Sequence, residues 1–222
     1  MRGKPLRELI VPGLALLLTA ITGMRLGWAG EVRRWTFAEG PSGQTPPGWK
    51  VVAGSWEVRY EANTGNRVLV QRGPAVPSFY RAAILSPFPP VRDVRGTVKM
   101  RPLGAGGSVA MGLILQWQDP GTMLIITVED SPGRIWLKRV QGGETSLRAC
   151  YMVPLKRDRW DRLTASVQGN WLNLFLNWTF LGGLRIDNPS SGRVGLMAGP
   201  NADIMFDDLE VTPLSPLGGK PG

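Results

Sequence analysis

The sequence predicts an all-β fold in which two antiparallel sheets pack face to face as a sandwich. Three observations predict it. Short segments alternate between apolar and polar residues, turn sequences separate them at intervals of about 8 to 12 residues, and no helical period is sustained after residue 29. The chain has 222 residues, 43% of them hydrophobic and 19% charged, which excludes an intrinsically disordered protein. This length suits one sandwich domain with its own core.

Residues 1–29 are predicted to be a signal peptide. Three basic residues lie within the first seven, residues 9–24 are mainly apolar, and Gly27 and Ala29 form a small-residue cleavage site. The apolar run is shorter than the roughly 20 residues that a membrane-spanning helix needs. Because Arg25 separates the run from the cleavage site, an uncleaved anchor formed by residues 9–24 is the alternative. We expect a secreted or periplasmic protein, or a membrane-anchored one.

The middle of the chain contains the clearest strand patterns. In residues 94–100 every second residue is apolar or glycine, which predicts a half-buried antiparallel strand. Residues 109–117 place Val109, Met111, Leu113 and Leu115 on one face. The turn sequences DPG, SPG and QGG then separate further short strands.

The segment 171–180 is predicted to be a single central strand, because both of its faces carry large residues. One face holds Leu172, Leu174, Leu176 and Trp178, and the other holds Trp171, Asn173, Phe175 and Asn177. The pair Gly182-Gly183 is predicted to turn the chain after this strand.

The last predicted strands cover residues 192–197 and 202–211. The apolar phase shifts between Phe206 and Leu209, which predicts a β-bulge at Asp207-Asp208. The Pro- and Gly-rich tail, residues 213–222, is predicted to be disordered. We therefore expect a β-sandwich domain over residues 30–212.

Three groups of short motifs follow one another along the chain in a recognisable order. They are GW with GSWEV at 48–49 and 54–58, GLILQWQDP at 112–120, and GRVGL with FDDLEV at 192–196 and 206–211. Their order resembles the concanavalin A-like lectin and glucanase superfamily, in particular its LamG-like jelly-roll branch. The resemblance implies two curved antiparallel sheets, with ligands on a concave face or at the rim loops. The 3-keto-disaccharide hydrolase family shares this sandwich, but its functional residues have no assignable counterparts in this sequence.

Several absences argue against catalysis. The chain has no histidine, and its single cysteine, Cys150, lacks an imidazole partner and is expected to be a small apolar strand residue. The glucanases of this superfamily carry an E-x-D-x-x-E strand motif, which is missing here. The nearest carboxylates are Glu129-Asp130 and the group Asp207, Asp208 and Glu210. We therefore assign no catalytic residue.

Calcium is the one cofactor that the sequence leaves open. No cofactor is required, but Asp207 and Asp208, together with backbone carbonyls or Glu39, could supply oxygen ligands to a structural calcium ion. The alternative is that the two aspartates bind turn amides.

Candidate carbohydrate-binding residues combine flat aromatic rings with amide groups, because a sugar ring presents C–H faces and a fringe of hydroxyls. On one strand they are Trp171, Asn173 and Asn177, and on another they are Gln116 and Gln118. The alternative for each tryptophan is a core position.

The predicted function is an exported, non-catalytic β-sandwich module that binds carbohydrate or a cell-surface glycan. The alternatives are a glycan-processing hydrolase that uses carboxylates and a structural or adhesive module with a protein partner. Nucleic-acid binding is not expected despite the formal net charge of +9, because no basic stripe or reading element is present. The basic residues of the cluster at 156–162 alternate with Asp158 and Asp161. The sequence makes no prediction of oligomeric state.

Overall fold

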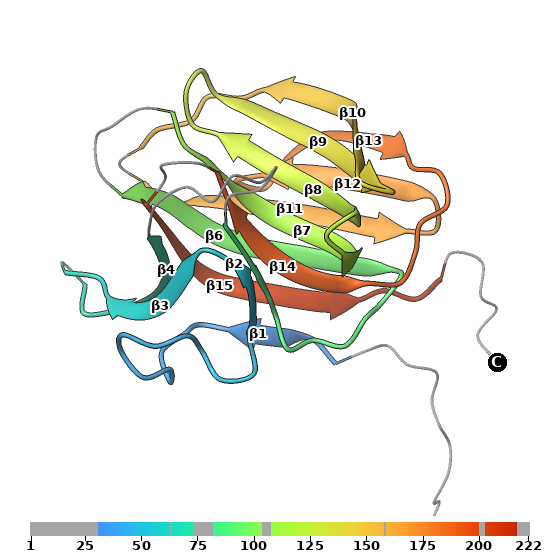
Figure 1. Ribbon diagram of the computed structural model, residues 1–222. Helices are drawn as coiled ribbons and strands as arrows, with labels where there is room; N and C mark the ends of the chain where they lie inside the picture. The colour runs from blue at the N-terminus through green and yellow to red at the C-terminus, as the bar shows by residue number, and fades with distance from the viewer. Residues whose placement is uncertain are drawn as a thin grey trace, which may run out of the picture.

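The computed structural model describes residues 31–62, 64–72, 82–103, 108–157, 159–199 and 203–216. Within these residues the chain forms fifteen strands in two antiparallel sheets and no helix (Figure 1). The predicted all-β sandwich of two antiparallel sheets is therefore confirmed. The predicted signal peptide or anchor lies outside the described residues, and none of the described segments forms a helix that could span a membrane.

Sheet A has the strand order β13-β12-β11-β6-β15-β4-β3, and β1 pairs with β15. Its strands are β1 (Arg33–Trp35), β3 (Ser55–Tyr60), β4 (Arg67–Arg72), β6 (Val94–Leu103), β11 (Asp161–Gln168), β12 (Trp171–Leu176), β13 (Thr179–Arg185) and β15 (Asp203–Pro213).

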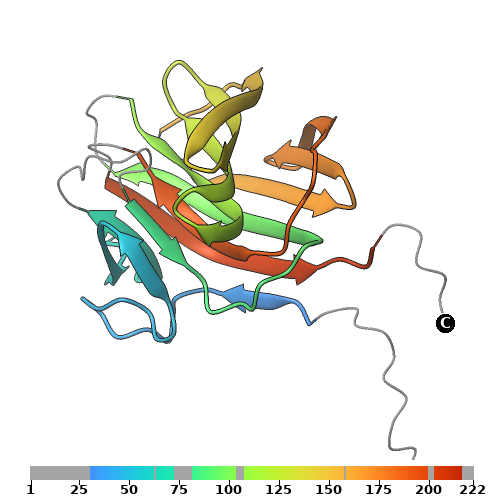
Figure 2. The ribbon, with the colours of Figure 1, turned by 45° about the vertical axis from the view of Figure 1, so that its right-hand side comes forward.

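Sheet B has the order β10-β9-β8-β7-β14-β5-β2. Its strands are β2 (Lys50–Ala53), β5 (Ala82–Leu85), β7 (Ala110–Asp119), β8 (Thr122–Glu129), β9 (Arg134–Gln141), β10 (Glu144–Met152) and β14 (Arg193–Ala198). Figure 2 shows the two layers, with the β9–β10 and β12–β13 hairpins at the same end of the sandwich.

The main core lies between the two sheets and follows from strand alternation. In β11 and β12, Leu163, Ala165, Leu172 and Leu174 are fully buried, while the residues between them face outward. Full burial of each leucine contributes about 1.5–3 kcal/mol relative to exposure. The predicted inward face of β6 and of the segment 109–117 is confirmed, because Val98 and the leucines of β7 belong to this core.

The outer face of sheet B is also apolar and buried. Ile114 points away from the main core, because its neighbours Leu113 and Leu115 point into it. It belongs to a second cluster that comprises Ala83, Leu85, Ile114, Trp117, Met123, Ile125, Val140 and Met197. The middle of this face therefore offers few polar side chains to a ligand, in contrast to the outer face of sheet A.

The prediction of one strand over residues 171–180 is wrong. The chain turns at Asn177 and Trp178, whose φ angles of 49° and 70° lie in the left-handed region, and this turn joins β12 to β13. Trp178 is consequently not on the apolar face of a strand but at the tip of a hairpin. The predicted turn at Gly182-Gly183 is also wrong, since both glycines lie within β13.

The predicted bulge at Asp207-Asp208 is confirmed. The pairing of β15 with β6 shifts between Asp207 and Glu210, and Asp208 has a φ of 50°. Phe206 and Leu209 both enter the main core as a result. The strand continues to Pro213, and the Ser215 carbonyl accepts a hydrogen bond from Gln168, so the sandwich includes residues beyond 212. Residues 217–222 of the predicted tail lie outside the described residues.

Cys150 lies in a strand, as expected, but its side chain is exposed on β10. It pairs with Trp136 of β9 at the edge of sheet B.

Candidate functional site

A single row of side chains crosses the outer face of sheet A. The registers place Phe180, Phe175, Thr164, Thr97, Glu210 and Arg34 opposite one another on β13, β12, β11, β6, β15 and β1. From β12 to β15 the row spans three strand spacings, about 14 Å. Residues from distant parts of the chain therefore form one line across the strands.

The centre of this row is a groove of about 450 Å³. Thr97 and Thr164 form its floor, and their hydroxyls are hydrogen-bonded to each other at 3.0 Å. These side chains are short, whereas the surrounding ones are long, so the sheet is hollowed along the row. The groove is lined by Arg95, Thr97, Arg162, Thr164, Phe175, Trp178 and Glu210, and we call it the sheet A groove.

Trp178 overhangs the sheet A groove from the β12–β13 turn. Its side chain is 79% exposed, and the guanidinium of Arg162 lies 4.5 Å from the centre of its ring. A cation on one face holds the indole in place by about 0.5–1 kcal/mol at an exposed site. The other face of the ring is free to stack on an apolar surface.

The turn that carries Trp178 is anchored by the side chain of Asn177. Its Oδ1 accepts from the backbone N–H of Arg162 at 2.8 Å, and its Nδ2 donates to Asp161 Oδ1 at 2.6 Å. Burial raises the pKa of Asp161, although the hydrogen bond from Asn177 and the charge of Arg159 act in the opposite direction. The turn is therefore joined to the first residues of β11, next to Arg162.

The charged residues of the groove are not neutralised by one another. Within the part of the chain that the structure describes, no ion pair involves Arg95, Arg162 or Glu210. Arg95 makes a long contact of 3.5 Å with the Thr212 hydroxyl, and the Nε of Arg162 is buried without an acceptor. Two guanidinium groups and one carboxylate thus remain available to a ligand in the groove.

Two of the predicted carbohydrate-binding residues lie on the same face as the groove. Trp171 and Asn173 point outward from β12, and Trp171 is 51% exposed. Phe175 is two residues further along the strand and contacts Phe180 of β13 at 5.1 Å between ring centres. The distance along β12 from Trp171 to Phe175 is about 13 Å. An aromatic stripe therefore runs from Trp171 to the groove.

The other predicted carbohydrate-binding residues are not part of this arrangement. Both functional groups of the Asn177 side chain are already hydrogen-bonded to Asp161 and Arg162 of β11. Gln116 and Gln118 belong to β7 in sheet B, where Gln116 is buried and donates to the Arg92 carbonyl, and Gln118 donates to the Ser191 carbonyl. The structure brings neither glutamine near Trp171.

The predicted calcium ligands bind groups of the protein itself. Asp208 pairs with Lys99 at 2.7 Å and with Arg34 at 3.0 Å. Burial acts to raise the pKa of Asp208, but the two cations outweigh it and hold the pKa below its usual value. Asp207 accepts from Asn66 at 2.9 Å and from the amide of Asp208, and burial raises its pKa. No group of three or more potential metal ligands occurs among the described residues.

None of the seven described residues that line the sheet A groove was among the predicted carbohydrate-binding residues. Strand alternation does predict that Thr97 and Thr164 each lie on the same face as the polar residues two positions away along their strands. The Asn-Trp pair was the available signal for the turn, because asparagine readily adopts the left-handed conformation.

No protein-family model and no curated protein matches the sequence. Among solved structures, the fold is similar to the carbohydrate-binding module CBM66 of Bacillus subtilis, with a TM-score of 0.62, 18% identity, and coverage of 74% of this chain and 95% of that one. It is similar to the GH43 protein BlXynB of Bacillus licheniformis, with a TM-score of 0.60, 13% identity, and coverage of 82% and 39%.

A third similar structure is the Crh5 transglycosylase, with a TM-score of 0.56, 11% identity, and coverage of 86% of this chain and 87% of that one. At these identities the likeness concerns the fold alone. It supports a two-sheet jelly-roll sandwich as the fold, whereas membership of the concanavalin A-like superfamily, its LamG-like branch and the relation to 3-keto-disaccharide hydrolases remain predictions.

Proposed function

We propose that this protein is a non-catalytic module that binds a glycan in the sheet A groove. A sugar ring would stack its C–H face on Trp178, while its hydroxyl or carboxylate groups would bind Arg95, Arg162 and Glu210. The aromatic stripe towards Trp171 would hold further sugar residues. The similar structures include a carbohydrate-binding module, a GH43 protein and a transglycosylase, which supports this class of ligand.

The observation that carries the proposal is the combination of an exposed indole with unpaired charges over one hollow. Trp178 is 79% exposed in a backbone conformation that favours glycine, and Arg162 has a buried N–H without an acceptor. Each feature is unfavourable in the free protein. A ligand that covers the ring and accepts from the guanidinium would offset both.

Binding without hydrolysis is favoured by the carboxylates of the groove. Glycoside hydrolysis by the common mechanisms needs two carboxyl groups on either side of the scissile bond. Glu210 is the only carboxylate among the described residues that line the sheet A groove. The buried pair Asp207 and Asp208 is engaged by Asn66, Lys99 and Arg34, which leaves it poorly suited to acid–base chemistry. A carboxylate-dependent hydrolase and an adhesive module for a protein partner remain the alternative functions.

We further propose that the module acts outside the cytoplasm, either secreted or periplasmic after cleavage near residue 29, or held at a membrane by residues 9–24. Its partner would be a polysaccharide or a cell-surface glycan rather than a nucleic acid. No cofactor would be needed for binding, since Asp208 already has two cationic partners.

Affinity electrophoresis in gels that contain soluble polysaccharides tests the proposal. The panel includes a neutral β-glucan, a xylan, a levan and polygalacturonate, each with and without a calcium chelator. We expect at least one polysaccharide to retard the protein, and Trp178→Ala to weaken the retardation strongly. Trp171→Ala should weaken it, because Trp171 lies at the far end of the stripe.

Leu147→Ala is the matched control, because Leu147 is similarly exposed but lies on β10 of sheet B. Its retardation should equal that of the unchanged protein. Retardation of Trp178→Ala as strong as that of the unchanged protein would show that the sheet A groove is not the binding site. Release of sugars from the retarding polysaccharide would favour the hydrolase instead.

A further inference from the structure

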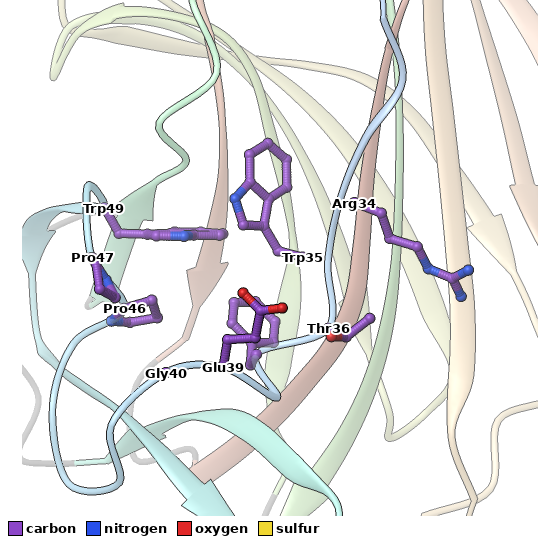
Figure 3. Close-up of a pocket in the computed structure, with 9 residues that line it drawn as sticks. Arg34, Trp35, Thr36, Glu39, Gly40, Pro46, Pro47 and Trp49 are labelled. Carbon is purple, nitrogen blue, oxygen red and sulfur yellow. The ribbon is translucent and has the colours of Figure 1, made fainter.

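A second pocket lies at the edge of the sandwich, where β1 and the loop after it close the space between the sheets. Its volume is about 360 Å³, near the lower end of the range for small-molecule sites. Figure 3 shows the walls that come from Trp35, Glu39, Pro46, Pro47 and Trp49, and Phe37 also lines the pocket. We call it the edge pocket.

The walls of the edge pocket are flat and apolar. The rings of Trp35 and Trp49 are 5.8 Å apart at an angle of 79°, and Phe37 contacts Trp49 at 5.5 Å. In Figure 3, Pro46 and Pro47 lie beside the indole of Trp49. Phe37 and Trp49 are buried, whereas Trp35 is half-buried, so the Trp35 ring offers the accessible apolar surface.

Glu39 is held at the mouth of the edge pocket by its own loop. Arg67 donates to the carbonyls on either side of it, Ala38 at 2.9 Å and Gly40 at 3.0 Å. Arg67 in turn bonds to the Tyr60 hydroxyl at 2.6 Å and stacks on that ring. Figure 3 shows the Glu39 carboxylate directed towards the space between the two indoles. In the described part of the chain, no hydrogen bond or ion pair engages this carboxylate.

A donor accompanies this acceptor. The indole nitrogen of Trp49 is buried, with the residue only 8% exposed, and it finds no acceptor among the described residues. A buried N–H without an acceptor is unfavourable, so a ligand oxygen would stabilise it. Arg34 adds no free positive charge, because its guanidinium points away from the rings in Figure 3 and pairs with Asp208 at 3.0 Å.

We propose that the edge pocket is a second binding site, which holds one neutral sugar residue at the end of a glycan chain. The inference rests on the same ligand class as the proposed function but on different residues. The Trp35 ring would contact the C–H face of the sugar, Glu39 would accept from its hydroxyls, and the Trp49 N–H would donate to one of its oxygens. The unpaired carboxylate would repel a uronic acid, unlike the two guanidinium groups of the sheet A groove.

Nuclear magnetic resonance of the indole N–H groups tests the site directly. The nitrogen-15-labelled Trp178→Ala variant, in which the sheet A groove lacks its aromatic wall, is titrated with the methyl β-glycosides of glucose, galactose and mannose. Loss of one signal in Trp35→Phe and in Trp49→Phe assigns the two resonances. We expect at least one glycoside to shift both signals in a saturable way.

Adding Glu39→Gln to the same background should weaken that binding by about tenfold, because a charged acceptor is replaced by a neutral one of the same shape. Glu144→Gln, an exposed carboxylate on β10, is the matched control and should leave the titration unchanged. The backbone amide signals of each variant verify that it is folded.

Three results would overturn the edge pocket as a neutral-sugar site. They are the absence of any indole shift up to the solubility limit of all three glycosides, equal affinity in Glu39→Gln, and saturable shifts with choline chloride or methyl glucuronide in place of the neutral glycosides. The proposed function fails separately, because its failure is a Trp178→Ala variant that the polysaccharide retards as strongly as the unchanged protein, whatever the indole shifts show.

Discussion

Replacing Trp178 with glycine tests whether the indole stabilises the β12–β13 turn or serves the binding of a glycan. Both central residues of the turn have positive φ angles, and in such turns the second position is most often glycine. A residue with a side chain in the left-handed conformation costs about 1–2 kcal/mol. Trp178 is 79% exposed, so burial of the indole recovers little of that cost. We infer that a tryptophan at this position is kept for binding rather than for folding.

The expected change in the free energy of unfolding follows from three contributions. Trp178→Gly removes about 1–2 kcal/mol of backbone strain. It loses about 0.5–1 kcal/mol of interaction with Arg162, and it loses a further 0.4–1 kcal/mol through the greater freedom of glycine in the unfolded chain. The net effect is within about 1 kcal/mol of zero. Trp178→Ala keeps the strain and loses the same contact, so it should be destabilised by about 0.5–1 kcal/mol.

Urea unfolding followed by far-ultraviolet circular dichroism measures these differences, and affinity electrophoresis on the retarding polysaccharide measures binding. Trp178→Gly should be at least as stable as Trp178→Ala, and both should bind the polysaccharide much more weakly than the unchanged protein. The reasoning fails if glycine destabilises the protein by several kcal/mol, since the indole would then support the fold. It also fails if the glycine variant binds the polysaccharide as strongly as the unchanged protein.

Three further changes test other parts of the molecule. Gly112→Ala should destabilise the protein by about 2 kcal/mol or more in urea unfolding, because its Cβ would lie 1.9 Å from the Ile126 carbonyl oxygen, which cannot move freely. Asp208→Asn should lower the free energy of unfolding by about 1 kcal/mol at pH 7, because the neutral amide no longer pairs with cations such as Lys99. The folded state lowers the pKa of Asp208, so the stability that its carboxylate provides is present above the unfolded pKa. This stability is lost as the pH falls through the folded pKa. The unfolding curves of the variant and the unchanged protein should therefore converge in acid. Arg95→Gln should weaken retardation by polygalacturonate several-fold and reduce its dependence on salt, while retardation by a neutral glycan should change less; equal losses on both would argue against a charge-selective groove.

The layers of this fold were predictable because the strands are amphipathic. In β11 and most of β6, every second residue is apolar or glycine, and burial of that face needs a second sheet. The bulge in β15 was predictable for the same reason, since Phe206 and Leu209 can both face the core only if the strand gains a residue between them. Local alternation thus specifies which face of each strand is buried.

The groove was not predictable, because it depends on register and on a turn. Nothing local in the sequence indicates that Thr97 pairs with both Thr164 and Glu210, which are 67 residues and more than 100 residues away along the chain. The turn at Asn177 and Trp178 was hidden by apolar alternation that continues through Trp178 to Phe180. A tryptophan in place of glycine made the segment look like strand, although the conformation is the one that glycine prefers.

The bulge and the groove are connected through the phase of β15. Beyond Asp207 and Asp208 the strand faces are exchanged, so Leu209 and Val211 enter the core and Glu210 faces outward into the row with Thr97. Without the extra residue, Glu210 would point into the main core, where an unpaired carboxylate is highly unfavourable. Asp208 fits the bulge because an aspartate tolerates a positive φ, and its carboxylate pairs with Lys99 and Arg34 on the two flanking strands. Asp208, which the sequence suggested as a calcium ligand, therefore helps to hold β1 and β6 beside β15, and the bulge that contains it places Glu210 on the face of the sheet A groove.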